Sequence, residues 1–315
     1  MSASGGCRAG HGWDRIALGT VQLGLPYGRR AARGPMSPAR ARDVLDAAWA
    51  LGVRHFDTAE AYGDAAERLA AWLAGSRRLA EAHVVTKVPL DAGPADVEHA
   101  VRRFPGVASL TLLTHGSAPR STWLRLRAEA NARGAEAGES VYGPDEVARA
   151  VARPGIARVQ APGSAIDERA LTARGAARVP LDLRSVYLQG VLLDGPEAAE
   201  ARLPGAGRVA AAVRAAATEE GEPAAALLAA AALRMGRPGD RIVVGVDHPR
   251  ELKPLARAVV LAGDPEGGPG AAPGAEIIGR FRARVALALG AADIERLLDP
   301  RRWRAPDQPA AVVVR

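Results

Sequence analysis

The chain has 315 residues, of which 48% are hydrophobic and 24% charged, a composition typical of one large soluble domain or two modest ones. The net charge of +7 does not indicate nucleic-acid binding, because the arginines are spread along the sequence and only 4% of the residues are aromatic. A single cysteine, Cys7, and the lack of a membrane-length apolar run favour a cytoplasmic protein with no internal disulfide and no membrane partner.

Short apolar runs alternate with helix-forming segments along most of the chain. The apolar runs predict strands at 15–20, 53–57, 83–87, 109–115, weakly around 138–141, and at 157–161, 181–186 and 241–246. After a Gly/Pro-rich loop at 22–28, Ser37-Pro38 is a cap-and-proline signal that predicts a helix ended by Gly52. Further helices are expected at 65–74, 95–103, 122–133, 144–152, 209–217, 223–235, 249–260 and 276–289.

Eight strand–helix alternations over roughly 250 residues predict a (β/α)₈ TIM barrel in a single domain. A doubly wound open sheet is the alternative, but no G-x-G-x-x-G follows the first strand. The expected organisation is an N-terminal extension at 1–14 and the barrel at 15–262. A flexible Gly/Pro-rich insertion at 263–275 and C-terminal helices with a tail at 276–315 follow.

Polar residues close three consecutive predicted strands. Asp57, Lys87 and His115 stand at these ends, and Tyr62 follows the first of them in a loop. In a barrel of this type the carboxyl ends of the strands meet at one face, where active sites lie. A nearby ammonium lowers the pKa of a phenol from its usual value near 10, so we expect Lys87, held by Asp57, to make Tyr62 a proton donor. His115 would donate a second hydrogen bond to a substrate carbonyl oxygen.

Lysine is otherwise rare, with Lys253 the only other one in the chain. An ammonium is a compact charge whose pKa shifts readily, a property that a guanidinium cannot imitate. The retention of Lys87 in an arginine-rich sequence therefore favours a functional residue over a solvated strand end.

At these strand ends the sequence resembles the aldo-keto reductase family. The motifs that carry the resemblance are Leu18-Gly-Thr20, Asp57-Thr-Ala59, Tyr62-Gly63, Thr86-Lys87, Leu112-Leu-Thr-His115, Gly138-Glu-Ser140, Val159-Gln160 and Val244-Gly245. Arg184-Ser-Val-Tyr-Leu-Gln-Gly190 and Asp299-Pro-Arg-Arg-Trp303 are similar to a bacterial branch that resembles spore-coat polysaccharide proteins. The resemblance implies a barrel that reduces an aldehyde or ketone with NAD(P)H, usually NADPH, with Tyr62 as the acid and Asp57, Lys87 and His115 in support.

The resemblance also implies a set of cofactor-binding residues and no metal. They are Gly19, Thr20, Ser140, Gln160, Arg184, Val246 and Arg250. Ser140 and Gln160 match the positions that bind the nicotinamide carboxamide, and Arg184 stands where an aromatic side chain usually stacks on the nicotinamide ring. Acidic residues beside Arg250 make NADH the alternative cofactor. The resemblance implies a small-molecule carbonyl or alcohol substrate, and the bacterial branch points to sugar-like or natural-product substrates; the sequence does not indicate an oligomeric state.

Three positions depart from the family pattern. Val141 replaces the asparagine that usually follows the serine, Glu139 stands where an apolar residue is expected to face the helices, and Arg184 either replaces the stacking aromatic or pairs with Asp182. These departures keep a second reading open, in which the same barrel is a catalytically weak nucleotide-sensing or partner-binding protein.

Overall fold

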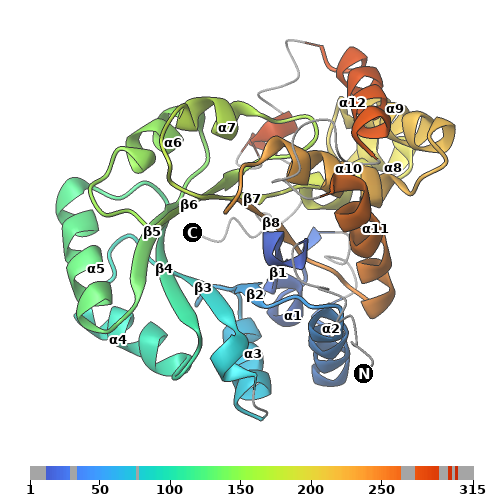
Figure 1. The fold of residues 1–315 in the computed structure, drawn as a ribbon. Coiled ribbons are helices and arrows are strands. Elements are labelled where there is room, and N and C mark those ends of the chain that lie inside the picture. The colour runs from blue at the N-terminus through green and yellow to red at the C-terminus, as the bar shows by residue number, and fades with distance from the viewer. Residues whose placement is uncertain are drawn as a thin grey trace, which may run out of the picture.

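A closed barrel of eight parallel strands forms the centre of the molecule (Figure 1). The computed structural model describes residues 12–28, 34–75, 78–263, 274–290, 297–299 and 302–303. The strands pair in chain order, and they are β1 Ile16–Gly19, β2 His55–Asp57, β3 His83–Val88, β4 Ser109–His115, β5 Glu136–Ser140, β6 Arg158–Pro162, β7 Leu181–Arg184 and β8 Arg241–Val244. The predicted (β/α)₈ barrel is confirmed, including the weakly patterned fifth strand.

Helices surround the barrel and follow the strands (Figure 1). The longer ones are α2 Pro38–Ala50, α3 Ala65–Ala74, α4 Pro94–Arg103, α5 Arg120–Ala132, α6 Pro144–Val151, α9 Ala206–Glu219, α10 Ala224–Met235, α11 Lys253–Ala262 and α12 Ala275–Leu287. Short elements join them: η1 Trp13–Arg15, α1 Val21–Gly24, η3 Leu79–Glu81, α7 Arg169–Arg174, η4 Leu188–Leu193, α8 Pro196–Arg202 and η5 Pro249–Leu252. At the start of α2 the Ser37 hydroxyl accepts the Arg40 N–H at 3.4 Å, as the cap signal predicted.

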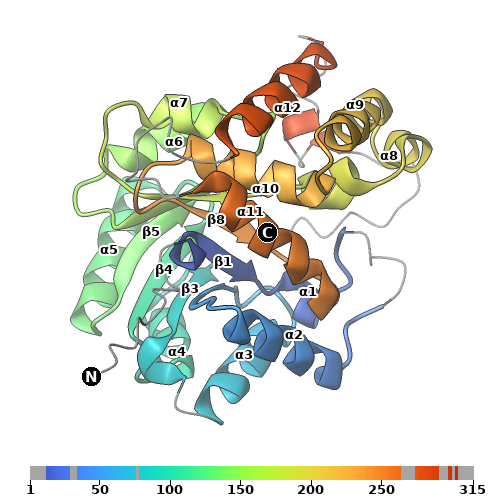
Figure 2. The ribbon, with the colours of Figure 1, turned by 45° about the vertical axis from the view of Figure 1, so that its right-hand side comes forward.

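The segment between β7 and β8 is longer than in the other repeats. Helices α8 and α9 precede α10, and α12 lies beside α9 and α10 (Figure 2). This second layer explains why residues 226–233 of α10 are buried on all sides, as an Ala/Leu-rich helix without a polar face requires.

Several element predictions differ from the structure. The loop after β1 contains the short helix α1, the helix expected at 249–260 is divided into η5 and α11, and α7 and α8 were not predicted. These elements are short, four to ten residues, so they carry too few turns for a clear apolar period. The proposed extension at 1–14 and insertion at 263–275 lie largely outside the described residues. No helix in the described ranges is long and apolar enough to cross a membrane.

A polar layer fills the barrel interior at the amino ends of the strands. The rings of His55 and His83 stack with centroids 4.5 Å apart, and His83 Nδ1 lies 2.8 Å from the Ser109 hydroxyl oxygen. Burial lowers the pKa of His55 to about 2, with Arg241 and His83 adding to the effect. His55 is therefore neutral in the folded protein at any pH near neutrality.

This depressed pKa predicts a loss of stability in mild acid. Unfolded His55 takes up a proton below its ordinary pKa of 6.5, whereas the folded form resists it down to about 2, so the stability is present above 6.5 and falls as the pH drops. Between pH 6.5 and 4.5 we expect His55 to account for about 2–3 kcal/mol of lost unfolding free energy. Urea unfolding at both pH values should show a smaller loss for His55→Gln than for the wild type. Equal losses would contradict the prediction.

Candidate active site

The carboxyl ends of the strands bring the predicted polar residues to one mouth of the barrel. Asp57 ends β2, Lys87 is the last residue but one of β3, and His115 ends β4. Ser140 ends β5 opposite His115 and also pairs in register with Gln160 of β6. Side chains that are up to 103 residues apart in sequence thus meet within one site.

Asp57 is the centre of a buried hydrogen-bond network. Its Oδ1 accepts from the Lys87 ammonium at 2.6 Å and from the Gln160 amide nitrogen at 2.7 Å. The Ser140 hydroxyl donates in turn to the Gln160 amide oxygen at 3.2 Å. The Asp57 and Lys87 side chains are 6% and 1% exposed, so this ion pair is shielded from water and rigidly held. Gln160 links Asp57 and Lys87, predicted to be catalytic, to Ser140, predicted to bind the cofactor.

The network also determines the charge on Lys87. Burial lowers the pKa of the Lys87 ammonium, while the attraction of Asp57 and the hydrogen bond to it act in the opposite direction. A second hydrogen bond runs from the ammonium to the Thr58 carbonyl oxygen at 3.3 Å. The opposite charges of Lys87 and Asp57 therefore largely cancel, and the pair presents little net charge to its surroundings.

Tyr62 lies beside this ion pair, with the Lys87 nitrogen 5.1 Å from the centroid of its ring. Burial raises the pKa of the Tyr62 phenol, and the Asp57 carboxylate raises it further, while Arg184 opposes them. The structure differs here from the expected lowering of this pKa by Lys87, because burial and the Asp57 carboxylate raise the pKa and the ammonium is paired with Asp57. The phenol is therefore protonated at neutral pH, and its hydroxyl makes no hydrogen bond within the described ranges.

His115 faces the same mouth as a neutral ring. Burial lowers its pKa to about 4, and the nearby charges of Lys87 and Arg184 contribute. A neutral imidazole still carries one N–H, so His115 keeps the ability to donate a hydrogen bond to an oxygen at the mouth.

The loop that carries Tyr62 is held from two sides. On one side, a Cβ at Gly24 of α1 would lie 2.1 Å from the Tyr62 carbonyl oxygen, and one at Gly63 would lie 2.7 Å from the Gly24 carbonyl oxygen. Gly63 also has φ +61°, which disfavours other residues. On the other side, Arg103 at the end of α4 binds Glu60 through two hydrogen bonds of 3.2 and 3.0 Å. These contacts fix the position of the phenol.

Arg184 ends β7 on the far side of the mouth. Its Nη2 donates to the Val141 carbonyl oxygen at 3.0 Å, and its guanidinium carbon lies 4.3 Å from the centroid of the Tyr142 ring. The suggested pairing of Arg184 with Asp182 is wrong, because Asp182 binds Arg158 at 2.8 Å. Arg158 is the first residue of the neighbouring strand β6, and its side chain reaches Asp182 of β7.

The mouth contains a further tyrosine that sequence reasoning did not single out. Burial raises the pKa of Tyr27, Tyr62 and Tyr142 act in the same direction, and Arg184 and Lys87 oppose them. A Cβ at the adjacent Gly28 would lie 3.1 Å from the Gln189 carbonyl oxygen, so the loop after β1 meets the loop after β7. The position of Tyr27 in the first strand-end loop was the only signal for it.

The remaining predicted cofactor residues are spread around the β1 and β8 ends. Thr20 is buried and donates from its hydroxyl to the Asp57 carbonyl oxygen at 3.0 Å, next to Gly19, which pairs in register with Asp57. Val246 is buried beyond the end of β8, which stops two residues earlier than predicted. Arg250 is exposed in η5. The structure brings Gly19 and Thr20 to Asp57, while Arg250 lies at the surface.

Glu139 has a structural partner that explains its unusual place in β5. Its side chain is fully buried outside the barrel, where Oε2 accepts from Arg153 Nε at 2.7 Å and Oε1 from the Ala118 N–H at 2.8 Å. Arg153 also donates to the Ala118 carbonyl oxygen. The pair ties the loop that follows His115 to the chain after α6.

Removing one partner of this pair should destabilise the protein. Arg153→Met leaves the buried Glu139 carboxylate with only one N–H donor. We expect the unfolding free energy to fall by about 2 kcal/mol. The loss is not larger because the Arg153 site is partly exposed, so water can reach the carboxylate. Arg102→Met, which changes an exposed arginine, is the matched control. Urea unfolding measures both, and equal stability of the two variants would refute a role for this pair.

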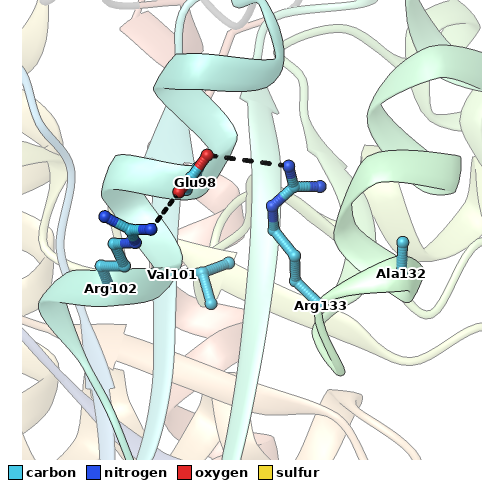
Figure 3. A pocket seen from close by; sticks show the side chains of 5 residues that line it. All are labelled: Glu98, Val101, Arg102, Ala132 and Arg133. Atoms are coloured by element: carbon cyan, nitrogen blue, oxygen red, sulfur yellow. Dashed lines mark ion pairs between the residues drawn. The ribbon is translucent and has the colours of Figure 1, made fainter.

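A hollow on the outer surface is not part of this mouth. It has a volume of about 500 Å³ between α4 and α5 and is lined by Glu98, Val101, Arg102, Ala132 and Arg133 (Figure 3). Its charges are already paired, since Glu98 contacts Arg102 at 2.5 Å and Arg133 at 3.9 Å. The hollow lies at the carboxyl ends of the helices, away from the strand ends that carry Asp57 and Tyr62.

Comparisons with known proteins agree with this architecture. A model of the aldo/keto reductase family matches residues 15–104, a span that contains Asp57, Tyr62 and Lys87. No curated protein sequence matches the chain significantly.

Solved structures share the fold at low sequence identity. A glycerol dehydrogenase from Gluconobacter oxydans is 18% identical, with a TM-score of 0.63 over 87% of this chain and 92% of that one. An aldo-keto reductase from Klebsiella pneumoniae in complex with NADPH is 20% identical, with a TM-score of 0.53 over 93% and 92% of the two chains. The holo form of an aldo-keto reductase from Bacillus halodurans is 17% identical, with a TM-score of 0.57 over 85% and 91%. The chain therefore folds as these reductases do, and its first 90 barrel residues match the aldo/keto reductase family.

Proposed function

We propose that this protein is an oxidoreductase of the aldo-keto reductase type that reduces an aldehyde or ketone to an alcohol with NAD(P)H. In this reaction the carbonyl compound, NAD(P)H and one proton give the alcohol and NAD(P)⁺. The observation that carries the proposal is the buried Asp57–Lys87 ion pair beside a protonated Tyr62 at the carboxyl ends of the strands.

The cofactor would be held by residues that offer suitable donors and acceptors. Ser140 and Gln160 present a hydroxyl and an amide 3.2 Å apart at neighbouring strand ends, a pair that suits the carboxamide of nicotinamide. The Arg184 guanidinium has Tyr142 on one face, which leaves the other face for a ring. When bound, the nicotinamide cofactor supplies the hydride. Gly19, Thr20 and Val246 would line its path, and Arg250 would bind its adenosine end.

The protein side chains would bind the carbonyl oxygen and supply its proton. Tyr62 and neutral His115 would donate hydrogen bonds to this oxygen, and Tyr62 would transfer its proton as negative charge develops. Lys87 lies close enough to stabilise the resulting phenolate, and Asp57 keeps the ammonium oriented. Positive charge from Arg184 opposes the effect of Asp57 on the phenol and eases the transfer.

Nucleotide titration followed by a turnover assay tests this function. We expect purified protein to bind NADPH with quenching of tryptophan fluorescence, and to oxidise it when aldehydes or ketones are added. NADH is titrated in parallel, because the residues near the end of β8 could suit either cofactor. Arg250 suits the 2′-phosphate of NADPH, whereas the neighbouring Asp247 and Glu251 suit the ribose hydroxyl of NADH. Tight binding without turnover over a broad carbonyl panel would favour a nucleotide sensor. Binding of neither nucleotide would refute both functions.

A further inference from the structure

The groups around Tyr62 at the mouth of the barrel leave one positive charge without an opposite charge. Asp57 and Lys87 neutralise each other at 2.6 Å, and burial keeps His115 uncharged at neutral pH, with a pKa of about 4. Tyr27 and Tyr62 are neutral because burial raises their pKa values. Arg184 is the remaining positive charge among these groups, and it acts on the pKa values of both Tyr62 and His115.

Arg184 differs from several other buried or partly buried arginines of the molecule. Arg158, Arg174 and Arg153 each bind a carboxylate, at 2.8, 2.6 and 2.7 Å. Within the described ranges Arg184 has no carboxylate partner, and its one hydrogen bond goes from Nη2 to the Val141 carbonyl oxygen. A guanidinium has five N–H donors, so most of those on Arg184 are left for another acceptor.

The surroundings hold this guanidinium in a defined orientation. Tyr142 stacks on it at 4.3 Å, and the hydrogen bond to Val141 fixes its rotation. All three non-glycine residues with positive φ in the described ranges lie within five residues after Arg184: Ser185 at +63°, Leu188 at +48° and Gln189 at +53°. Such conformations cost about 1–3 kcal/mol each and collect at ligand-binding sites.

We infer that Arg184 binds a carboxylate on the substrate, so that the preferred substrates are aldehydes or ketones that carry a carboxylate group. A planar guanidinium with free N–H groups matches the two oxygens of a carboxylate, and its orientation is already set by Tyr142 and Val141. The carboxylate would lie toward β7, and the carbonyl group would lie toward Tyr62 and His115. This inference rests on the proposed reductase function for its substrate.

Matched substrates measure the contribution of the carboxylate. We compare 4-carboxybenzaldehyde with its neutral methyl ester, and succinic semialdehyde with butanal, in the wild type, Arg184→Met and Arg184→Lys. The wild type should favour each acid over its neutral partner in kcat/KM. Because a hydrogen bond to a charged group contributes about 1.5–3 kcal/mol, Arg184→Met should lower that preference about 10-fold to 100-fold. Arg184→Lys keeps the positive charge but lacks the planar guanidinium, so this variant should retain part of the preference for the acid.

A control separates a local contact from a change in net charge. Arg214→Met removes an exposed charge from α9 and should leave the acid-to-neutral preference at the wild-type value. A preference that is equal in wild type and Arg184→Met for both substrate pairs would overturn the inference.

Binding without turnover distinguishes this inference from the proposed function. We measure benzoate and benzamide by saturation-transfer NMR with the wild type, Arg184→Met and Arg184→Lys. Benzoate binding that exceeds benzamide binding and depends on Arg184 supports the anion site even if no carbonyl is reduced, in which case only the reductase function fails. Carbonyl reduction combined with Arg184-independent benzoate binding leaves the reductase function standing and refutes the anion site.

Discussion

Tyr62→Phe is expected to lower kcat for carbonyl reduction about 10³-fold, within the range of general acid catalysis. The variant loses the only phenol that lies over the Lys87 ammonium, while Asp57, Gln160 and Ser140 keep their hydrogen bonds. The dissociation constant for NADPH should therefore change less than a few-fold. Steady-state kinetics and fluorescence titration measure the two quantities separately.

A second tyrosine provides the control for this variant. Tyr187 donates from its hydroxyl to the Ala225 carbonyl oxygen at 3.1 Å in the outer part of the barrel, away from Lys87. Tyr187→Phe should keep most of the turnover. If Tyr62→Phe also retained turnover within 10-fold of the wild type, the proton would have to come from another group.

Lys87→Met is expected to lower the unfolding free energy by about 3–5 kcal/mol, the usual cost of leaving one charge of a buried pair without its partner. Asp57 would then keep only the Gln160 amide as a side-chain donor while its side chain remains 6% exposed. Urea unfolding at pH 7 gives the change directly. Turnover should fall as well, because the phenolate of Tyr62 would lose the cation that lies beside its ring.

The only other lysine makes a matched control, and a double variant tests the coupling. Lys253 is exposed at the start of α11, so Lys253→Met should change stability by less than about 0.5 kcal/mol. The double variant Asp57→Asn, Lys87→Met removes both charges and should be less destabilised than the sum of its two single variants. Additive losses would mean that the two side chains do not depend on each other.

The barrel could be predicted from sequence because its signals are local. Each strand is a short apolar run, and helices such as α2 and α3 have clear starts and stops near Ser37, Gly52 and Gly75. The order of these elements then predicts where the strand ends meet. Elements without such signals, such as α7 and α8, were not found, and their positions depend on packing against the completed barrel.

The candidate site was predictable only in part. Asp57, Lys87 and His115 follow from their places at strand ends, and the structure brings Asp57 and Lys87 into direct contact. The hydrogen bond from Gln160 to Asp57 joins residues 103 positions apart in the sequence. It depends on the register of the strands in the closed barrel, which cannot be predicted from a local sequence pattern.

The charge state of the site was decided by burial and not by residue type. The sequence suggested a phenol made acidic by Lys87, but the folded protein pairs Lys87 with Asp57 and buries Tyr62, which raises the pKa of the phenol. A pKa depends on desolvation and on every charge nearby, and both are known only when the chain is folded.

The eightfold alternation of strands and helices, and the polar residues that close the strands, could be predicted from the amino-acid sequence alone. These features are predictable because the spacing of apolar residues, the capping residues and the strand ends each depend on only a few neighbouring positions. The folded barrel was needed to show that Arg153 holds Glu139, that Tyr62 raises the pKa of Tyr27, and that Arg184 stacks on Tyr142 without a carboxylate partner in the described ranges. Those arrangements arise from the closure of the barrel, which brings distant residues together and removes water from around their charges.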